Sequence, residues 1–391
     1  MKLRLPVQHL AAAVAHTVRA VSTRPVAPVM AGILFTTAAD GLHLAASDYE
    51  VYATYRVSAE IADEGRMLVP GRLLNDICSR MPKGVDVDLD ADDARLTISC
   101  RGSRFSVPLL PVDEYPALPG LPPAVATVGG EDWAEAVAQV VPAASTDDSL
   151  PVMTAVRVVL ADSRLTMMAT DRYRIAHRRL TVQPAPAPAA KGTKKKGSSE
   201  GADPLDVLIP GKVFGELARA YDVDRPLTLH SSGELWGWSS CDSTFLTRLI
   251  SGKFPGNITM IPEVTGTITA PAAEFLAAVQ RVALVATANT PVRLILGERG
   301  VLRIEAGSGD DARGSDLIEV NLTGDLSPDY LIAFNPAYLA DGIKATAVAE
   351  VVLHVGDHLK PAVLTARTGP GDEDIEAQPY RYVIMPVRLN S

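Results

Sequence analysis

The chain has 391 residues, of which 47% are hydrophobic and 21% are charged, and its formal net charge is −9. This charge argues against a protein that holds nucleic acid by bulk electrostatic attraction, and no apolar run reaches the about 18 residues of a membrane-spanning helix. Three cysteines without a CxxC pair and seven dispersed histidines indicate a cytoplasmic protein in a reducing compartment, with no metal and no cofactor.

Two helices are predicted in each third of the chain. Apolar residues recur at helical spacing within 7–21, 133–144 and 275–286. A second helix follows a proline in LVPGRLLNDI (68–77), LIPGKVFGEL (208–217) and IAFNPAYLADGI (332–343), since proline is tolerated where a helix starts. Ile77 and Tyr221 are expected on the apolar faces of the first two of these helices.

Short strands are predicted between the helices. The run 85–99 alternates with a period of two residues and is expected to form a hairpin around Asp92 and Asp93. The pair Asp147–Asp148 has no counterpart in the other thirds, which favours a loop or a helix cap over a catalytic carboxylate pair. The pattern predicts an α+β fold, with an antiparallel sheet and two helices on one face of it.

The same phrases occur three times along the chain. The prolines that precede the second helices, Pro70, Pro210 and Pro336, lie 140 and then 126 residues apart, which is the size of a domain rather than of a solenoid repeat. We therefore predict three tandem copies of one domain, over residues 1–123, 124–263 and 264–391. The segment 183–204, rich in Pro, Ala, Gly, Ser and Lys, is predicted to be a solvated loop inserted in the second domain.

Motifs of catalysis are not recognisable in the sequence. It contains no GxxxxGK[ST] phosphate loop, no HExxH or GxSxG motif and no Cys–His cluster. A catalytic enzyme on a repeated-domain scaffold is an alternative of another class, but it would need a convergent set of titratable side chains in one copy. The sequence supplies none, so we expect a protein without catalytic residues of its own.

Five further segments match one family in order and spacing over essentially the whole chain. They are TRPVAPVMAGI (23–33), MATDRYRIA (168–176), SGKFPGNITMIP (251–262), AFNPAYLADGI (333–343) and YRYVIMPVRL (380–389). Together they make the chain resemble the bacterial β sliding clamps, the beta subunit of DNA polymerase III. The resemblance implies a processivity factor of DNA replication, accessory to the polymerase III holoenzyme and without enzymatic activity.

The resemblance also implies an assembly. Two chains of three domains would form a head-to-tail homodimeric ring around duplex DNA, with helices lining the hole and sheets outside. A heterologous contact that closes on itself avoids open filaments, and joining domains edge to edge would satisfy sheet edges. Its implied partners are double-stranded DNA, bound without sequence readout, and the polymerase, clamp loader and repair proteins, which carry short linear motifs; no membrane is involved.

Three basic residues correspond to DNA-facing positions of the family: Arg24, Arg72 and Lys212. For each of them a solvated or capping role is the alternative. The predicted helices carry as many acidic as basic residues, so we expect retention on DNA by topology rather than by tight binding to phosphates.

A partner-peptide pocket between the second and third domains is also implied. Carried over position by position, its lining is Leu160, Thr170, Arg172, Tyr173, Arg174, Ile175, Pro255, Thr259, Met260, Asn335, Tyr338, Leu359, Pro361, Val383, Ile384, Met385, Pro386, Val387, Arg388 and Leu389. Val383, Ile384 and Leu389 would also be core residues in any sheet of this kind. Implied dimer contacts are Phe105 and Val107 in the first domain, facing Leu284 and Val285 in the third.

The chain departs from the family near this pocket. Residues 256–259 replace a stretch that usually carries a basic or aromatic residue, and 285–294 is one residue longer than in some relatives. An alternative function is therefore a specialised second clamp copy with an altered pocket that resists a clamp-binding antibiotic. A third interpretation is a paralogue that no longer loads on DNA and only sequesters partners.

Overall fold

The computed structural model describes residues 1–186, 204–218, 221, 223–256, 261–287, 290–307, 312–367, 369 and 374–389. The lysines of the predicted insertion and two predicted pocket residues, Thr259 and Met260, lie outside the described residues. The chain divides into two compact units. Unit 1 comprises Met1–Trp133, Val182–Gly197 and Glu216–Leu249, and unit 2 comprises Ala134–Thr181, Ser198–Gly215 and Ile250–Ser391.

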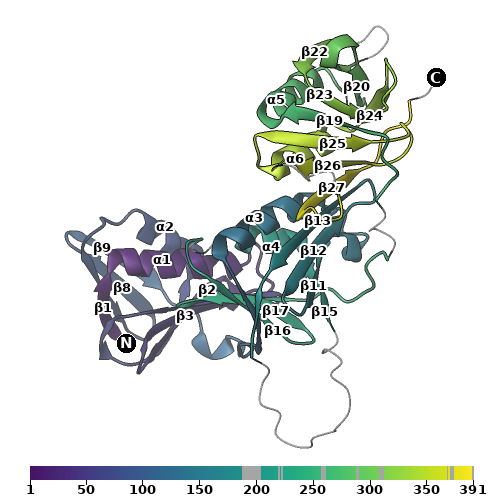
Figure 1. Ribbon diagram of the computed structural model, residues 1–391. Coiled ribbons are helices and arrows are strands. Elements are labelled where there is room, and N and C mark those ends of the chain that lie inside the picture. The colour runs from purple at the N-terminus through teal and green to yellow at the C-terminus, as the bar shows by residue number, and fades with distance from the viewer. Residues whose placement is uncertain are drawn as a thin grey trace, which may run out of the picture. The chain divides into compact units, whose positions relative to one another are not determined.

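Within the described residues, unit 1 contains a five-stranded and a nine-stranded sheet (Figure 1). The five-stranded sheet has the order β5 (Glu60–Asp63), β1 (Lys2–Pro6), β7 (Asp86–Ala91), β8 (Arg95–Cys100) and β9 (Ser103–Pro108). The nine-stranded sheet has the order β14 (Gln183–Pro184), β10 (Ala124–Val128), β16 (Leu227–Ser231), β17 (Leu235–Ser240), β18 (Ser243–Arg248), β4 (Val51–Val57), β3 (Gly41–Ser47), β2 (Gly32–Ala38) and β6 (Arg66–Pro70).

Unit 2, over the part of the chain that the structure describes, contains a nine-stranded and a four-stranded sheet. The larger sheet has the order β15 (Leu205–Pro210), β11 (Ala155–Ala161), β12 (Arg164–Thr170), β13 (Arg174–Thr181), β27 (Tyr380–Ile384), β26 (Ala362–Ala366), β25 (Glu350–Val355), β19 (Gly266–Pro271) and β23 (Asn321–Gly324). The smaller sheet has the order β22 (Gly314–Glu319), β21 (Val301–Ala306), β20 (Val292–Leu296) and β24 (Leu331–Phe334).

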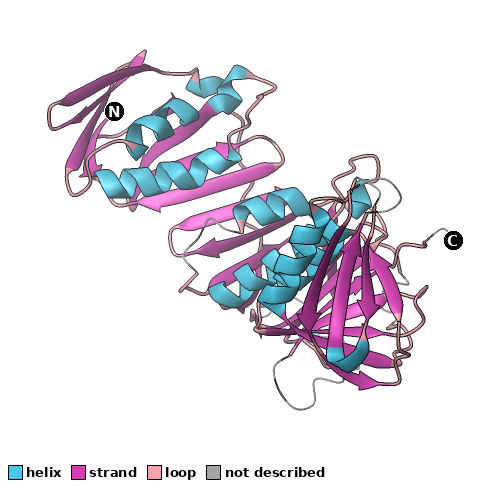
Figure 2. Cartoon of the chain, turned by 90° about the horizontal axis from the view of Figure 1, so that it is seen from above, coloured by secondary structure: helices cyan, strands magenta, loops and turns pink. Residues whose placement is uncertain are grey.

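The described α-helices come in pairs along the chain, as the sequence predicted. They are α1 (Val7–Thr17), α2 (Gly71–Ser79), α3 (Gly130–Val140), α4 (Gly211–Leu217), α5 (Ala272–Ala283) and α6 (Pro336–Thr346). Figure 2 shows helices (cyan) lying against strands (magenta), and α1 contacts α2 and β4 while α5 contacts α6 and β21. None of the helices in the described part of the chain is long and apolar enough to cross a membrane.

Each unit contains a sheet that crosses a predicted domain boundary. Strand β4, from the predicted first domain, pairs antiparallel with β18, from the second. Strand β13, from the second domain, pairs antiparallel with β27, from the third. The edge strands of adjacent copies thus satisfy each other's backbone hydrogen bonds at both junctions, as expected.

Apolar helix faces supply the cores. In α1, Leu10 and Val14 are fully buried, and in α5 Phe275 and Val279 are as well. Trp133 at the start of α3 meets Trp238 of β17, with ring centroids 5.9 Å apart, inside unit 1. Burial of such faces provides most of the stabilisation of an amphipathic helix.

Two details of the predicted helix faces were wrong. Helix α4 ends at Leu217, so Tyr221 lies beyond it, where its hydroxyl donates to the backbone oxygen of Gly130 at 3.0 Å. In α2, Ile77 is only partly buried and Cys78 takes the fully inward position at 3% exposure, because the face rotates by one residue over this short helix.

The turn predictions were confirmed. Strands β7 and β8 form the hairpin, and the side chain of Asp92 accepts hydrogen bonds from the backbone N–H groups of Ala94 and Arg95 at 2.8 and 2.7 Å. Those two bonds hold the pKa of Asp92 below its usual value. Asp147 lies in a loop, where it accepts a hydrogen bond from the N–H of Ser149 at 3.0 Å.

Candidate peptide-binding site and DNA-facing residues

The predicted pocket residues from two distant parts of the sequence meet in unit 2, where β13 pairs with β27. Ile175 is the register partner of Val383. Beyond the end of β27, the C-terminal tail (Met385–Leu389) continues along the same region: the N–H of Met385 donates to the oxygen of Tyr173 at 2.8 Å. The N–H of Val387 donates to the oxygen of Ala333, at the end of β24, at 2.7 Å.

Arg174 joins the β12–β13 turn to α6. Its side chain is 10% exposed and pairs with Asp171 at 2.9 Å and with Asp341 of α6 at 2.6 Å. Its guanidinium lies over the ring of Tyr338, 4.3 Å from the centroid, a cation–π contact. Burial alone would lower the pKa of Arg174, but Tyr382 and the two carboxylates raise it above its usual value, so the side chain stays charged.

Two tyrosines extend this arrangement. The Tyr382 hydroxyl accepts a hydrogen bond from Nη1 of Arg174 at 3.3 Å and donates to the backbone oxygen of Tyr338 at 2.8 Å. Tyr173, which is 55% exposed, stacks on Tyr338 with ring centroids 6.4 Å apart. These side-chain contacts therefore hold together the β12–β13 turn, the start of α6 and strand β27.

The β12–β13 turn has a constrained backbone. Arg172 has φ 81°, a left-handed conformation that favours glycine. The hydroxyl of Thr170 accepts from the N–H of Arg172 at 3.1 Å and donates to the oxygen of Arg174 at 2.7 Å. These bonds hold the turn despite the strain, and they leave Tyr173 projecting from it.

Helix α6 begins at this site with a side-chain cap. Asn335 accepts hydrogen bonds from the N–H groups of Ala337 and Tyr338 at 2.9 and 3.3 Å, and Pro336 occupies the first helical position. Such a cap stabilises a helix by about 1 kcal/mol. Asn335 thus has a structural role in addition to its predicted place in the pocket.

The predicted lining includes both exposed and buried side chains. Exposed positions able to contact a ligand include Tyr173, Leu359, Met385, Val387 and Leu389, each at least 37% exposed. Ile384 is fully buried and Thr170 is 2% exposed, so they support the site from below. Leu160, Pro255 and Pro361 are partly buried, and Arg172 and Arg388 are exposed.

Residues that the sequence did not suggest line a pocket of about 420 Å³ beside the tail. Leu359, Val387 and Leu389 belong to the predicted set, whereas Tyr330 and Leu331 do not. The Tyr330 hydroxyl donates to the oxygen of Gly356 at 2.9 Å, and burial raises the pKa of Tyr330 to about 12. The sequence signal that could have identified Tyr330 as a lining residue is its position immediately before the strand that leads to Pro336.

The predicted DNA-facing residues lie on the surface. Arg24 is exposed in the loop after α1, Arg72 is exposed on α2 and Lys212 is exposed on α4. In unit 1, Nη2 of Arg72 donates to the oxygen of Val21 at 3.3 Å, three residues from Arg24. This bond keeps the base of the Arg24 loop against α2.

The predicted dimer residues differ in accessibility. Leu284, after α5, is 84% exposed and Phe105 on β9 is 39% exposed, whereas Val107 is 2% exposed and faces the interior of unit 1. Val285 is partly buried. Side-chain contacts with a partner are thus available to Phe105 and Leu284 rather than to Val107.

The chain is similar to known proteins in both sequence and structure. The models of the N-terminal, central and C-terminal domains of the DNA polymerase III beta subunit match residues 1–119, 127–256 and 259–388. The beta sliding clamp of Streptomyces coelicolor is 41% identical over the full length of both chains. The beta sliding clamp homolog GriR of Streptomyces muensis is 31% identical, also over the full length of both.

Solved structures share the fold. A sliding clamp from Pseudomonas aeruginosa bound to griselimycin superposes with a TM-score of 0.86 at 22% identity, and the clamp from Bacillus subtilis with 0.85 at 23%. Both comparisons cover all of both chains. With three tandem clamp domains of α+β architecture and full-length relatives at this identity, the chain belongs to the bacterial beta sliding clamp family, whose members are DNA sliding clamps and polymerase processivity factors.

Proposed function

We propose that two copies of this chain form a closed ring around duplex DNA and tether DNA polymerase to it. The observation that carries this proposal is the sheet architecture. Copies of one fold join edge to edge through β4–β18 and β13–β27, and β9 and β22 are among the eight strands that end the described sheets. A ring closes when each of these edges meets the other in a second chain.

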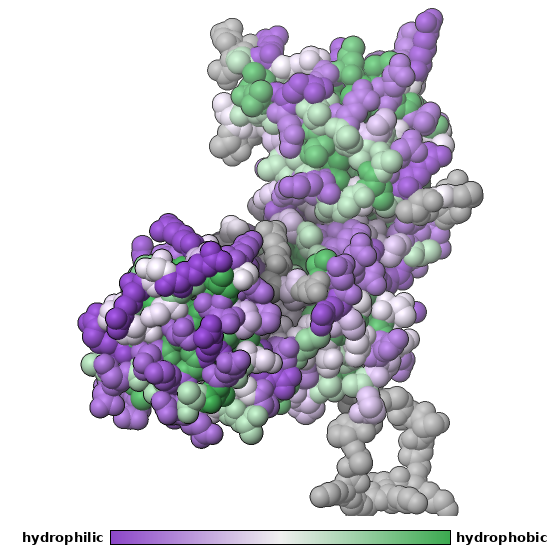
Figure 3. Space-filling view, turned by 90° about the vertical axis from the view of Figure 1, so that its left-hand side faces the viewer, coloured by the Kyte–Doolittle hydropathy of each residue, from purple (hydrophilic) through white to green (hydrophobic). Residues whose placement is uncertain are grey.

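The chemistry of the two edges supports that contact. All side chains of β9 except Val107 are exposed, and β22 carries Leu317, which is 60% exposed. Figure 3 shows that apolar side chains (green) lie between hydrophilic ones (purple) on the visible face of unit 1. Leu284→Asp is expected to convert the dimer to monomer in sedimentation velocity, whereas Leu322→Asp, at another exposed leucine, should leave it intact.

Loading onto DNA tests the function directly. The clamp loader should place the protein on nicked circular DNA, and cutting the circle should release it, because a ring held by topology slides off an end. We propose that Arg24, Arg72 and Lys212 make weak phosphate contacts, so removal of all three should lower loading without changing release. Retention on the linear product would contradict the ring, and failure to load while peptide binding persists would favour the sequestering paralogue.

We propose that polymerase and other partners bind through the exposed side chains around the β12–β13 turn, α6 and the C-terminal tail. Tyr338→Ala with Met385→Ala should weaken binding of a polymerase-derived motif peptide about 30-fold, as expected for a hot-spot pair, and leave the dimer intact. Leu322→Ala is the matched control at an exposed position. An unchanged affinity would refute the assignment.

A specialised clamp copy with an altered pocket is the second candidate. The full-length similarity to GriR favours it, while the higher identity to a clamp that carries no such designation favours the first function. Titration of griselimycin against this protein and the Streptomyces coelicolor clamp separates the two. Equal affinities would exclude resistance.

We further propose that the protein acts in the cytoplasm and without a catalytic centre. All three cysteines are unpaired, which fits a reducing compartment. No group of three or more His, Cys, Asp or Glu side chains able to hold a metal is found among the residues described. Purified protein should stimulate polymerase processivity and show no nuclease or nucleotidase activity alone.

A further inference from the structure

One backbone hydrogen bond recurs in all three copies of the fold. It runs from the segment that follows the last strand of a copy (β9, β18 or β27) to the strand that precedes the second helix of that copy (β6, β15 or β24). Its donor and acceptor pairs are Leu110 to Leu68 at 2.9 Å, Ile250 to Leu208 at 2.8 Å and Val387 to Ala333 at 2.7 Å. The bond therefore identifies equivalent positions in the three copies.

In the first two copies, an aromatic side chain packs against this position. Tyr115 is 7% exposed and belongs to one apolar cluster with Leu68. Phe254 is 6% exposed and belongs to one apolar cluster with Leu208. Each aromatic residue follows the donor of the bond by four or five residues. The segments after β9 and β18 thus dock on their own copies through an aromatic ring.

The third copy has an open pocket at the equivalent position. This is the pocket of about 420 Å³ beside the C-terminal tail, and both residues of the bond, Ala333 and Val387, line it. Val387 and Leu389 are 37% and 43% exposed. Ala333 stands where the other two copies have leucine, and its smaller side chain leaves more room. The described residues therefore form an apolar recess where the other copies hold an aromatic ring.

The chemistry of the recess suits an aromatic side chain with a basic neighbour. Its apolar lining includes Leu331 and Leu359 in addition to the two residues of the tail, and aromatic side chains contribute large apolar areas to interfaces. Among the described residues that line it, Asp329 supplies a carboxylate and there is no lysine or arginine. This charge favours a segment with a basic residue over one with acidic residues.

We propose that this pocket binds an extended segment of a partner protein through an aromatic residue followed by proline, as the first two copies bind their own segments. Pro116 and Pro255 follow the two internal aromatic residues. Proline confines the residue before it to extended conformations, and Tyr115 has φ −75° and ψ 128°. Such a segment loses less conformational entropy on binding. The pocket shares its tail residues with the proposed peptide-binding site, so the inference rests on that proposed function.

The chain's own sequence supplies the probe for this pocket. A synthetic peptide of residues 250–256, ISGKFPG, should bind the full-length protein in calorimetry. Replacing its phenylalanine with alanine should weaken binding about tenfold, as expected for an aromatic anchor. With benzoylphenylalanine at that position, irradiation should crosslink the peptide to the lining of the pocket, which mass spectrometry of the digested protein locates.

Substitutions separate this pocket from the proposed motif site. Leu331→Ala should weaken binding of ISGKFPG about tenfold and leave the affinity for a polymerase-derived motif peptide unchanged. Tyr338→Ala with Met385→Ala should do the reverse, and Leu322→Ala, at an exposed leucine of β23, should change neither. If the motif peptide binds, the inference is overturned by equal affinity of the alanine-substituted peptide, by crosslinks outside the pocket, or by an equal loss in Leu322→Ala. Absence of motif-peptide binding would instead refute the proposed function.

Discussion

Replacing Arg174 with alanine should destabilise unit 2 more than any loss of a surface ion pair. The side chain is 10% exposed and is paired with Asp171, whose own side chain is 11% exposed. Its second partner, Asp341, is 44% exposed. Removal of the guanidinium therefore leaves one buried carboxylate without its counter-ion and one carboxylate that water can solvate.

The expected cost follows from that asymmetry. Breaking a buried ion pair from one side costs about 3–5 kcal/mol, whereas an exposed partner contributes about 0.2–1 kcal/mol. Asp171 retains hydrogen bonds from the N–H groups of Tyr173 and Arg174 at 3.0 and 3.1 Å, which moderates its penalty. We therefore expect a loss of about 3 kcal/mol in the free energy of unfolding, at the low end of the buried range.

Urea unfolding followed by far-UV circular dichroism measures this loss. With a denaturant slope of about 3 kcal/mol/M, the midpoint should fall by about 1 M. The chain's three tryptophans, at 133, 236 and 238, all belong to unit 1, so their fluorescence provides a separate readout of the other unit.

Arg367→Ala is the matched control, because its pair with Glu350 is 3.6 Å long and both side chains are more than 40% exposed. Its midpoint should move little. If Arg174→Ala shifted the circular dichroism midpoint no further than Arg367→Ala, the reasoning from burial would be refuted.

Other perturbations test the interior and the backbone. Burial lowers the pKa of His354 to about 4 from 6.5, so the folded state binds fewer protons between these values. The stability that depends on His354 should be fully present above pH 6.5 and fall by up to about 3 kcal/mol toward pH 4; His354→Gln should reduce the pH dependence by that share in urea titrations, while His177, whose pKa burial also lowers to about 4, keeps its own, with the exposed His9→Gln as the control. Arg172→Gly should raise the free energy of unfolding by about 1 kcal/mol by relieving the positive φ, whereas Arg164→Gly in β12 should lower it by about 0.5–1 kcal/mol; a loss at both would contradict the strain. Gly342→Ala would place a methyl 2.6 Å from an aromatic ring of β27 and should cost about 1–3 kcal/mol, and an unchanged melting temperature would show that α6 can shift.

The elements that sequence periodicity could predict are those whose signal is local. The buried faces of α1 and α5 follow from spacing alone, because a helix repeats every 3.6 residues. The early end of α4 could not be predicted, since Tyr221 continues the apolar spacing although the helix has stopped at Leu217. Helix propensity and hydrophobic periodicity are local signals, so they do not show where tertiary contacts take the place of a further helical turn.

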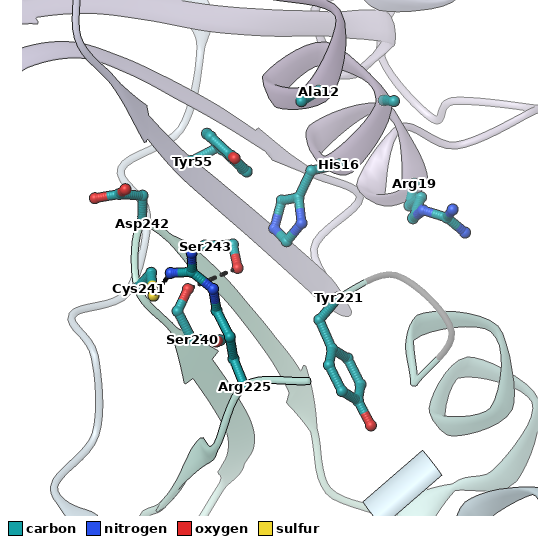
Figure 4. A pocket seen from close by; sticks show the side chains of 11 residues that line it. Ala12, His16, Arg19, Tyr55, Tyr221, Arg225, Ser240, Cys241, Asp242 and Ser243 are labelled. Atoms are coloured by element: carbon teal, nitrogen blue, oxygen red, sulfur yellow. Dashed lines mark hydrogen bonds between the residues drawn. The ribbon is translucent and has the colours of Figure 1, made fainter. Parts of the chain in front are cut away.

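The two concave sites were unequally accessible to sequence reasoning. The resemblance to the clamp family predicted three residues of the peptide-binding site, Tyr173, Tyr338 and Met385, because they lie in the matching motifs. The contact of Arg174 with Asp341, 167 residues apart, depends on how β13 aligns with β27. A pocket of unit 1, lined by His16 of α1, Tyr55 of β4 and Cys241 of the β17–β18 turn (Figure 4), likewise depends on the pairing of β4 with β18, which no local pattern in either strand specifies.

The joining of strands across copies has a consequence for any attempt to divide this polypeptide. A fragment ending at residue 263 would contain β13 without β27, and one ending at residue 123 would contain β4 without β18. Each would present a bare ladder of amide and carbonyl groups, which is a template for aggregation. The three modules are therefore structurally dependent neighbours, and we expect a single module expressed alone to be insoluble unless its exposed strand edge is redesigned.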